Sequence, residues 1–132
     1  MKSIILTSFS FVFIALLLTN CEKEKDTTLT VYVRDKQSAL VSGAVVDLTA
    51  DANGNKNINK DLDSMLITPG SGMVQFNLTK MYKAGQAGVA VMDIYAYKIV
   101  GEDTLIGHSY KKIEPQQDNV LNVAIDVKKV LN

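Results

Sequence analysis

The sequence predicts an all-β fold, a single antiparallel β-sandwich of about seven strands. Apolar and polar residues alternate with a period of two over much of the chain, which is typical of strands with one buried face. Clusters of glycine, proline and asparagine separate these stretches at short intervals, as turns do. No strongly amphipathic helix is indicated, so we expect the strands to bury their apolar faces against each other.

Seven stretches of the chain are predicted as strands. The first begins at Leu29, where Leu29, Val31 and Val33 alternate with polar or amphipathic neighbours. The others are rich in β-branched and aromatic residues, and they span residues 44–49, 65–68, 73–78, 89–100, 104–110 and 120–127. Together they supply enough strand for two packed sheets.

Turn signals lie between these stretches. Pro69-Gly70-Ser71-Gly72 is predicted to close one hairpin, and Gly101-Glu102-Asp103 a second one between two long strands. The segment from Thr79 to Gly88 fits neither pattern, and it has room for a helical turn around residues 80–83.

Charge and composition exclude several classes of protein. Lysine plus arginine and aspartate plus glutamate each total 14, and no basic stripe gathers on one segment, so nucleic acid is not an expected partner. The single cysteine rules out an internal disulfide, and the single histidine, His108, rules out a paired-histidine metal site.

The N-terminal segment has the pattern of an export signal. Met1-Lys2 gives a positive start, and residues 4–18 form an apolar stretch of fifteen residues followed at once by polar ones. A membrane-spanning helix needs about 20 apolar residues, so this stretch is too short for one and is better suited to a cleaved signal. We therefore expect residues 1–20 to be a signal peptide.

Leu18-Thr19-Asn20-Cys21 resembles a bacterial lipobox, in which the cysteine becomes the lipidated first residue of the mature protein. Asn20 departs from that pattern, because the residue before the cysteine is usually Gly, Ala or Ser. The resemblance implies a membrane partner through Cys21, and the mixed charges of residues 21–28 suit a solvated tether. The acidic residues after Cys21 resemble a signal for display on the outer membrane of some Gram-negative bacteria, which implies a cell-envelope location at the cell surface.

The rest of the chain resembles a known sandwich family. The stretches "LTVYVRD", "LVSGAVVDL", "TPGSGMVQFNL" and "VMDIYAY" are similar to the transthyretin-like, carboxypeptidase-regulatory-like domains, over Leu29 to Val127. The residues at the pattern positions are Gly43, Ala44, Val46, Leu48, Thr68, Gly72, Phe76 and Tyr95. The resemblance implies one domain over residues 29–132 with a mostly non-catalytic role as an accessory, adhesive or receptor-associated module. The chain departs from the family in its longer 51–63 loop and its 79–88 insertion.

The loop from Asp51 to Asp63 contains a partial calcium-binding pattern. Asp51, Asn53 and Asn55 place oxygen ligands at alternate positions, and a one-residue deletion would bring Asp61 into register. However, Lys56 stands where a calcium loop needs glycine, and Leu62 stands where it needs a bidentate acid. The pattern favours a solvated loop of Asn and Gly turns, and Ca²⁺ is the one cofactor that the sequence leaves open.

No set of residues predicts an active site. His108 lies within a predicted strand, where a solvent-facing or edge position fits it better than the role of a base, and no G-x-S-x-G motif supplies a nucleophile. Large amphipathic side chains offer a binding surface instead, and the candidates are Tyr82, Tyr95, Tyr97, Tyr110 and Phe76. Burial in the core or ordinary cross-strand pairing is the competing interpretation for each of them.

These observations predict a non-enzymatic, lipid-anchored envelope protein whose sandwich is a binding or structural accessory module. Its partner would be an envelope protein or a glycan. Two other functions stay open: a Ca²⁺-dependent carbohydrate-binding module, and a fimbrial or assembly subunit that uses an exposed strand edge.

Overall fold

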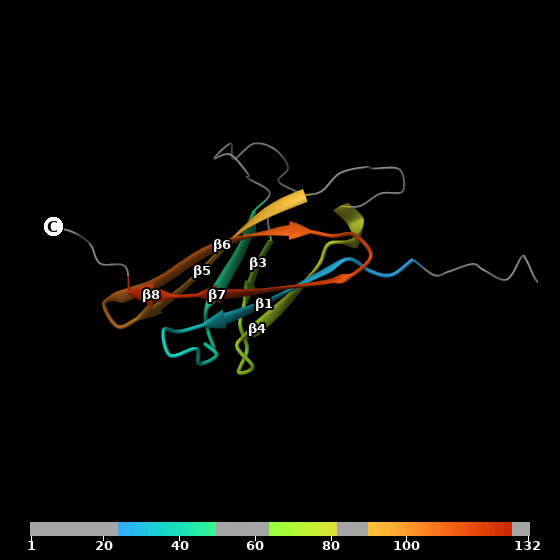
Figure 1. The fold of residues 1–132 in the computed structure, drawn as a ribbon. Coiled ribbons are helices and arrows are strands. Elements are labelled where there is room, and N and C mark those ends of the chain that lie inside the picture. The colour runs from blue at the N-terminus through green and yellow to red at the C-terminus, as the bar shows by residue number, and fades with distance from the viewer. Residues whose placement is uncertain (1–23, 50–63, 82–89, 128–132) are drawn as a thin grey trace, which may run out of the picture.

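The protein is a two-layer β-sandwich in the computed structural model, which describes residues 24–49, 64–81 and 90–127 (Figure 1). One layer is a three-stranded sheet of order β4-β1-β7, and the other is a five-stranded sheet of order β3-β2-β5-β6-β8. The elements are β1 (Thr28–Arg34), β2 (Val45–Thr49), β3 (Ser64–Ile67), β4 (Met73–Asn77), the 3₁₀ turn η1 (Thr79–Met81), β5 (Ala90–Val100), β6 (Asp103–Ile113), β7 (Asp118–Ala124) and β8 (Asp126–Val127). The all-β sandwich predicted from the sequence is confirmed. In the described part of the chain, no helix is long and apolar enough to span a membrane.

The core lies between the two sheets, and alternation along the strands fills it. Leu29, Val31 and Val33 of β1 face Val46 and Leu48 of β2, and all five side chains are fully buried. The remaining buried apolar side chains are Ala44, Val74, Phe76, Leu78, Met92, Ile94, Ala96, Ile113, Val123 and Ile125. Because burial of one such side chain contributes about 1.5–3 kcal/mol, this alternating set stabilises the sandwich without a disulfide.

The chain crosses between the sheets at the turn from Pro69 to Gly72. The amide of Gly72 donates to the carbonyl of Pro69 at 2.9 Å, which closes the turn. However, β3 pairs with β2 in one sheet and β4 pairs with β1 in the other. The hairpin predicted here is therefore wrong, since a local turn signal does not reveal whether the next strand stays in the same sheet. The second predicted hairpin is confirmed: β5 and β6 pair in antiparallel register from Val100 and Asp103 onward.

The last predicted strand is divided between the two sheets. β7 pairs with β1 in parallel, the only parallel pair among the described strands, and β8 pairs with β6 at Leu105 and Ile106. The chain changes sheet at Ile125, whose side chain is buried and whose amide donates to the carbonyl of Arg34 at 2.8 Å. Gly107 of β6 lies under this crossing, and a Cβ there would be 2.9 Å from the carbonyl carbon of Ala124.

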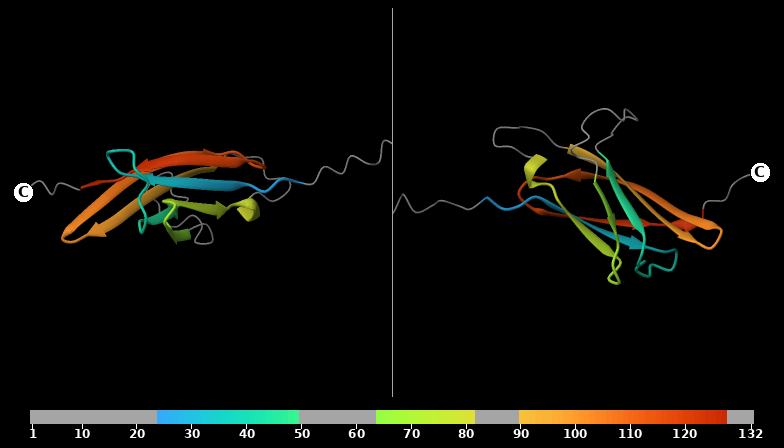
Figure 2. Two further views of the ribbon diagram at one scale, coloured as in Figure 1. Left: turned by 90° about the horizontal axis from the view of Figure 1, so that it is seen from below. Right: turned by 180° about the vertical axis from the view of Figure 1, so that it is seen from behind.

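The sandwich has two distinct ends. β1 begins at Thr28, and β7 begins beside it at Asp118, so we call this the Thr28 end. The β5–β6 hairpin and the Pro69–Gly72 turn lie at the opposite end, here called the hairpin end, as both views of Figure 2 show. The predicted helical turn is present at the Thr28 end as η1, one residue earlier than expected.

Candidate functional site on the outer face of the five-stranded sheet

The two solvent-facing surfaces of the sandwich differ in character. The solvent side of the three-stranded sheet carries hydrogen-bonded polar groups: the amide of Gln75 donates to the Thr30 hydroxyl at 3.2 Å, and Arg34 Nε donates to Asn122 Oδ1 at 2.9 Å. We call this surface the polar face. A polar solvent side is ordinary for a sheet whose other side packs on a core.

The solvent side of the five-stranded sheet is instead rich in apolar and aromatic groups. We call it the outer face, and the strand registers place on it Val45, Asp47, Thr49, Met65, Ile67, Val91, Asp93, Tyr95, Tyr97, Ile99, Thr104, Ile106, His108, Tyr110 and Lys112. Tyr110 is 70% exposed, Ile67 is 66% exposed and Met65 is 58% exposed. This concentration of exposed apolar side chains on one surface makes the outer face the candidate site.

The apolar side chains are aligned across the strands. Ile67 pairs with Val45, Val45 with Tyr97, and Tyr97 with Ile106, so four neighbouring strands contribute one continuous row. We call these four residues the apolar row. Ile99 extends the apolar surface toward the hairpin end, because it lies two residues beyond Tyr97 on the same side of β5.

A polar cluster lies next to the apolar row. The rings of Tyr95 and His108 stack with their centroids 4.3 Å apart and their planes 18° apart. His108 Nε2 lies 2.8 Å from Asp93 Oδ1, and since a carboxylate only accepts, the imidazole nitrogen donates. Ser109 follows His108 on β6, so its side chain projects to the opposite, inward face of the sheet. The stacking and the hydrogen bond therefore fix the positions of Tyr95, His108 and Asp93, and they do not align the Ser109 hydroxyl with His108.

The structure brings three of the predicted contact residues together and separates the others. Tyr95, Tyr97 and Tyr110 share the outer face. Phe76 is 3% exposed and belongs to the core, so the alternative interpretation holds for it. Tyr82 lies outside the described residues. Of the apolar row, only Tyr97 was among the predicted contact residues, and the three aliphatic members were missed, although apolar residues on both alternating sets of β5 could have indicated two apolar faces.

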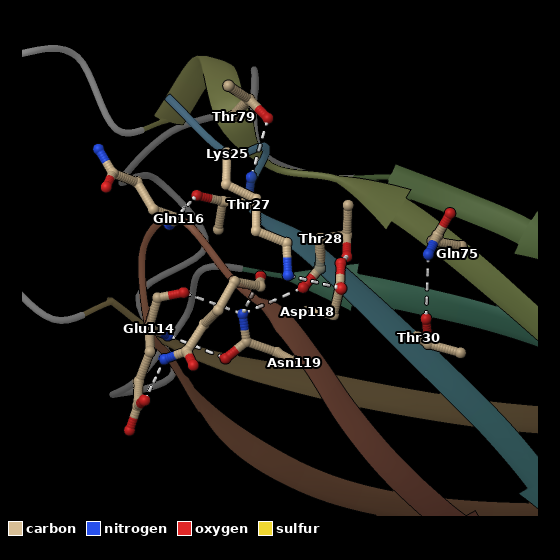
Figure 3. Close-up of polar contacts among 11 residues, drawn as sticks. Lys25, Thr27, Thr28, Thr30, Gln75, Thr79, Glu114, Gln116, Asp118 and Asn119 are labelled. Carbon is tan, nitrogen blue, oxygen red and sulfur yellow. Dashed lines mark hydrogen bonds and ion pairs between the residues drawn. The ribbon is translucent and has the colours of Figure 1, made fainter. Parts of the chain in front are cut away.

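A second ordered region fixes the start of the domain (Figure 3). Asp118 Oδ1 accepts from the Thr28 hydroxyl at 2.7 Å, and Asp118 Oδ2 accepts from Lys25 Nζ at 2.9 Å. The Thr28 hydroxyl, followed by the Lys25 ammonium, lowers the pKa of the Asp118 carboxyl from its usual value. The contacts of the ionised Asp118 carboxylate therefore stabilise the folded state at neutral pH. This stabilisation is lost as the pH falls through the lowered pKa.

Further hydrogen bonds hold Thr27 on both sides of β1. Together with the contacts among Lys25, Thr28 and Asp118, we call them the polar clamp. The amide of Thr27 donates to the Thr79 hydroxyl at 3.1 Å, and the Thr27 hydroxyl accepts from the amide of Gln116 at 2.8 Å. The carbonyl of Thr27 accepts from the amide of Leu78 at 2.8 Å. The chain is therefore held against both neighbours of β1 from Thr27 onward, and Lys25 adds an exposed ion pair on the β7 side.

The other predicted sites lie outside the described residues. These are Cys21 and the proposed calcium ligands Asp51, Asn53, Asn55 and Asp61. Within the described ranges, no group of three His, Cys, Asp or Glu side chains is placed to hold a metal ion. Lipidation of Cys21 and calcium binding by the loop both stay predictions.

Comparison with known proteins gives few matches. No protein-family model matches the chain, and no curated protein matches it. Among solved structures, it is similar to the dioxygenase domain of a dioxygenase carbohydrate-binding protein fusion from the cellulolytic bacterium Streptomyces sp. SirexAA-E. The sequences are 12% identical, the TM-score is 0.48, and the match covers 85% of this chain and 86% of that one. The function proposed below therefore rests on the residues of this chain.

Proposed function

We propose that this protein is a non-enzymatic binding module, anchored in the outer membrane through a lipidated Cys21 and displayed at the cell surface, whose outer face contacts a partner protein. The observation that carries the proposal is the contrast between the two sides of one sandwich. The polar face carries hydrogen-bonded side chains, whereas the outer face exposes the apolar row to water. A partner that covers the apolar row would remove this exposed apolar area from water.

The chemistry of the outer face favours a protein over a glycan. Ile67, Val45 and Ile106 offer aliphatic contact and no hydrogen-bonding group for a sugar hydroxyl, and a buried hydroxyl without a partner is costly. One face of the Tyr95 ring is already covered by His108, so it is closed to a sugar ring. Apolar cores with tyrosine at their margins are common in protein interfaces.

Cys21 provides the test of the anchor. Each buried CH₂ of an acyl chain contributes about 0.8 kcal/mol, so several chains on Cys21 would hold the domain at the membrane durably. We expect Cys21→Ser to move the protein from the detergent-soluble membrane fraction to the aqueous fraction, measured by phase partitioning of cell extracts. Thr19→Ser is the matched control and should leave partitioning unchanged. Unaltered membrane partitioning of Cys21→Ser would disprove the anchor.

Site-specific photo-crosslinking provides the test of the outer face. A benzoylphenylalanine in place of Tyr110 projects from the outer face, and the same group in place of Gln75 projects from the polar face. We expect a protein adduct from position 110 in living cells and none from position 75. A charge in the apolar row, Ile106→Lys, should reduce the adduct at position 110 at least severalfold, because the ammonium would be desolvated on binding.

Three outcomes would contradict the proposed contact. Equal adducts from positions 110 and 75 would indicate collision without a specific surface. No adduct from position 110, or one that Ile106→Lys leaves unchanged, would remove the outer face as the contact site. An adduct with the mass of two copies of this chain would replace the partner protein by self-association.

A further inference from the structure

We infer that the sandwich is oriented on the membrane, with its Thr28 end against the lipid surface and its hairpin end directed away. The inference rests on the proposed lipidation of Cys21 and deepens it, since it names the end of the domain that faces the lipid. Two observations support this orientation. The fold holds the chain only a few residues after Cys21, and the exposed apolar residues are distributed unequally between the two ends of the domain.

The tether is short because the clamp begins early. Thr27 is buried and bound on both sides of β1, and an exposed ion pair joins Lys25 to Asp118 at 2.9 Å. Only six residue steps separate Cys21 from Thr27. A fully extended chain covers at most about 3.3–3.6 Å per residue, so these steps reach about 20–22 Å. The Thr28 end would therefore stay within about 22 Å of the lipidated residue.

The far end of the domain lies beyond the reach of the tether. β6 runs from Asp103 at the hairpin end to Ile113 at the Thr28 end, and at about 3.4 Å per residue it spans about 34 Å. This length exceeds even the fully extended tether. Averaged over the directions in which the domain can lean, the hairpin therefore lies farther from the lipid surface than the Thr28 end.

The chemistry of the two ends agrees with this orientation. Most exposed residues of the Thr28 end are polar, and they include Asn77, Lys80, Glu114, Gln116 and Asp118, while Val91 and Val120 are the exposed large apolar residues nearest to it. The hairpin end carries the exposed apolar groups Leu40, Ile67, Ile99, Val100, Ile106 and Val127. A polar end suits a hydrated lipid surface, and the apolar row is left toward the medium from which a partner would approach.

Fluorescence quenching from the lipid surface tests the orientation. When Cys21 is lipidated, an introduced cysteine is the one free thiol of the chain, because the sequence has a single cysteine. Pro115→Cys marks the Thr28 end and Glu102→Cys marks the hairpin end, and both positions are exposed. Each lipidated full-length variant would be labelled with bimane at the introduced cysteine and incorporated into vesicles of phosphatidylethanolamine and phosphatidylglycerol. The vesicles would also contain a lipid with a nitroxide on its headgroup, which quenches bimane fluorescence at the lipid surface. We expect quenching at position 115 to exceed that at position 102 severalfold.

A longer tether is the matched control. About twelve Gly and Ser residues between Lys23 and Glu24 keep the clamp and extend the tether to about eighteen residues, with a mean span of about 21–25 Å against about 12–15 Å for the natural tether. The difference in quenching between positions 115 and 102 should then shrink. Equal quenching with the natural tether, or stronger quenching at position 102, would overturn the orientation. Flotation of the same samples separates the two proposals, since a protein that does not float with the vesicles contradicts the anchor itself.

Discussion

Alanine in place of Gly107 is expected to destabilise the sandwich by about 3 kcal/mol or more, the upper range for a side chain forced into a packed interior. A Cβ at this position would lie 2.9 Å from the Ala124 carbonyl carbon, closer still to the carbonyl oxygen, and 3.0 Å from Val123 Cγ1. The obstacle is backbone, which cannot rotate away as a side chain can. Relief would require β7 and β8 to move off β6 at the point where the chain changes sheet. Urea unfolding of the purified variant would measure the loss.

Gly70 provides the matched control for Gly107. A Cβ on Gly70 meets no atom within 4 Å, and its φ is not in the left-handed region. Gly70→Ala should therefore change the free energy of unfolding by no more than about 0.5 kcal/mol, as exposed substitutions usually do. If Gly107→Ala unfolds at the same urea concentration as the parent, the close approach of β6 to Ala124 is wrong. A Gly107→Ala chain that is insoluble while Gly70→Ala is soluble would agree with the expected loss.

Much of the fold follows from local pattern. In β1, Leu29, Val31 and Val33 alternate with the more polar Thr30, Tyr32 and Arg34, and this alternation alone places three side chains in the core. The β5–β6 hairpin was predicted from a Gly-Glu-Asp turn between two apolar runs, and Gly101 adopts a φ of 61°, which glycine tolerates best. Strand identity and face are local properties, so one sequence suffices to predict them.

The pairing of distant strands does not follow in this way. Apolar residues predict a strand at β7, but they indicate neither that Asn119 is buried while Val120 is exposed nor that β7 lies parallel to β1. The same limit applies to the turn at Gly72, which closes locally and still leads into the other sheet. The partner strand of β7 and that of β4 both depend on which sheet edge is unpaired when the strand packs. The residues of the strand and of its turn do not specify that edge.

The candidate site was predicted in part for the same reason. Tyr95, Tyr97 and Tyr110 were recognised by residue type, and their common face follows from the register of β5 and β6. Ile67 joins them only because β3 pairs with β2 at the edge of this sheet. A site that spans several strands therefore depends on the sheet order, and its β3 and β2 members could not be assigned before that order was known.

The polar clamp could be tested most directly at Asn119, a side chain that is 5% exposed and joins β7 to β1 and to the preceding turn. Its Oδ1 accepts from the amide of Glu114 at 2.9 Å, and its Nδ2 donates to the carbonyls of Thr28 and Glu114 at 3.0 Å and of Gln117 at 3.2 Å. Asn119→Ala would leave these partly buried backbone groups without their side-chain partner. Since each unsatisfied group costs about 1–3 kcal/mol, we expect a loss of about 2–4 kcal/mol in the free energy of unfolding.

Hydrogen exchange would show where the loss acts. The amide of Thr28 donates to the carbonyl of Gln117, and the amide of Leu78 donates to the carbonyl of Thr27, so both amides report on the start of the domain. We expect Asn119→Ala to increase exchange at these two amides more than at Ile94 in the centre of β5. Uniform acceleration at all three would instead indicate global destabilisation without a local clamp.

Two further variants separate the geometry of Asn119 from its polarity. Asn122→Ala, on the same strand, removes an exposed hydrogen bond to Arg34 and should cost no more than about 1 kcal/mol. Asn119→Asp keeps the shape but turns a carboxylate toward three carbonyl oxygens, which raises its pKa in the folded state above the unfolded value of about 3.9. The Asn119→Asp protein is therefore destabilised least at a pH below the unfolded-state pKa of its new carboxyl. Its free energy of unfolding decreases as the pH rises through the folded-state pKa. An Asn119→Asp protein equally stable at pH 4 and pH 7 would show that the three carbonyls do not converge on this side chain, and the clamp that shortens the tether would then lack its buried centre.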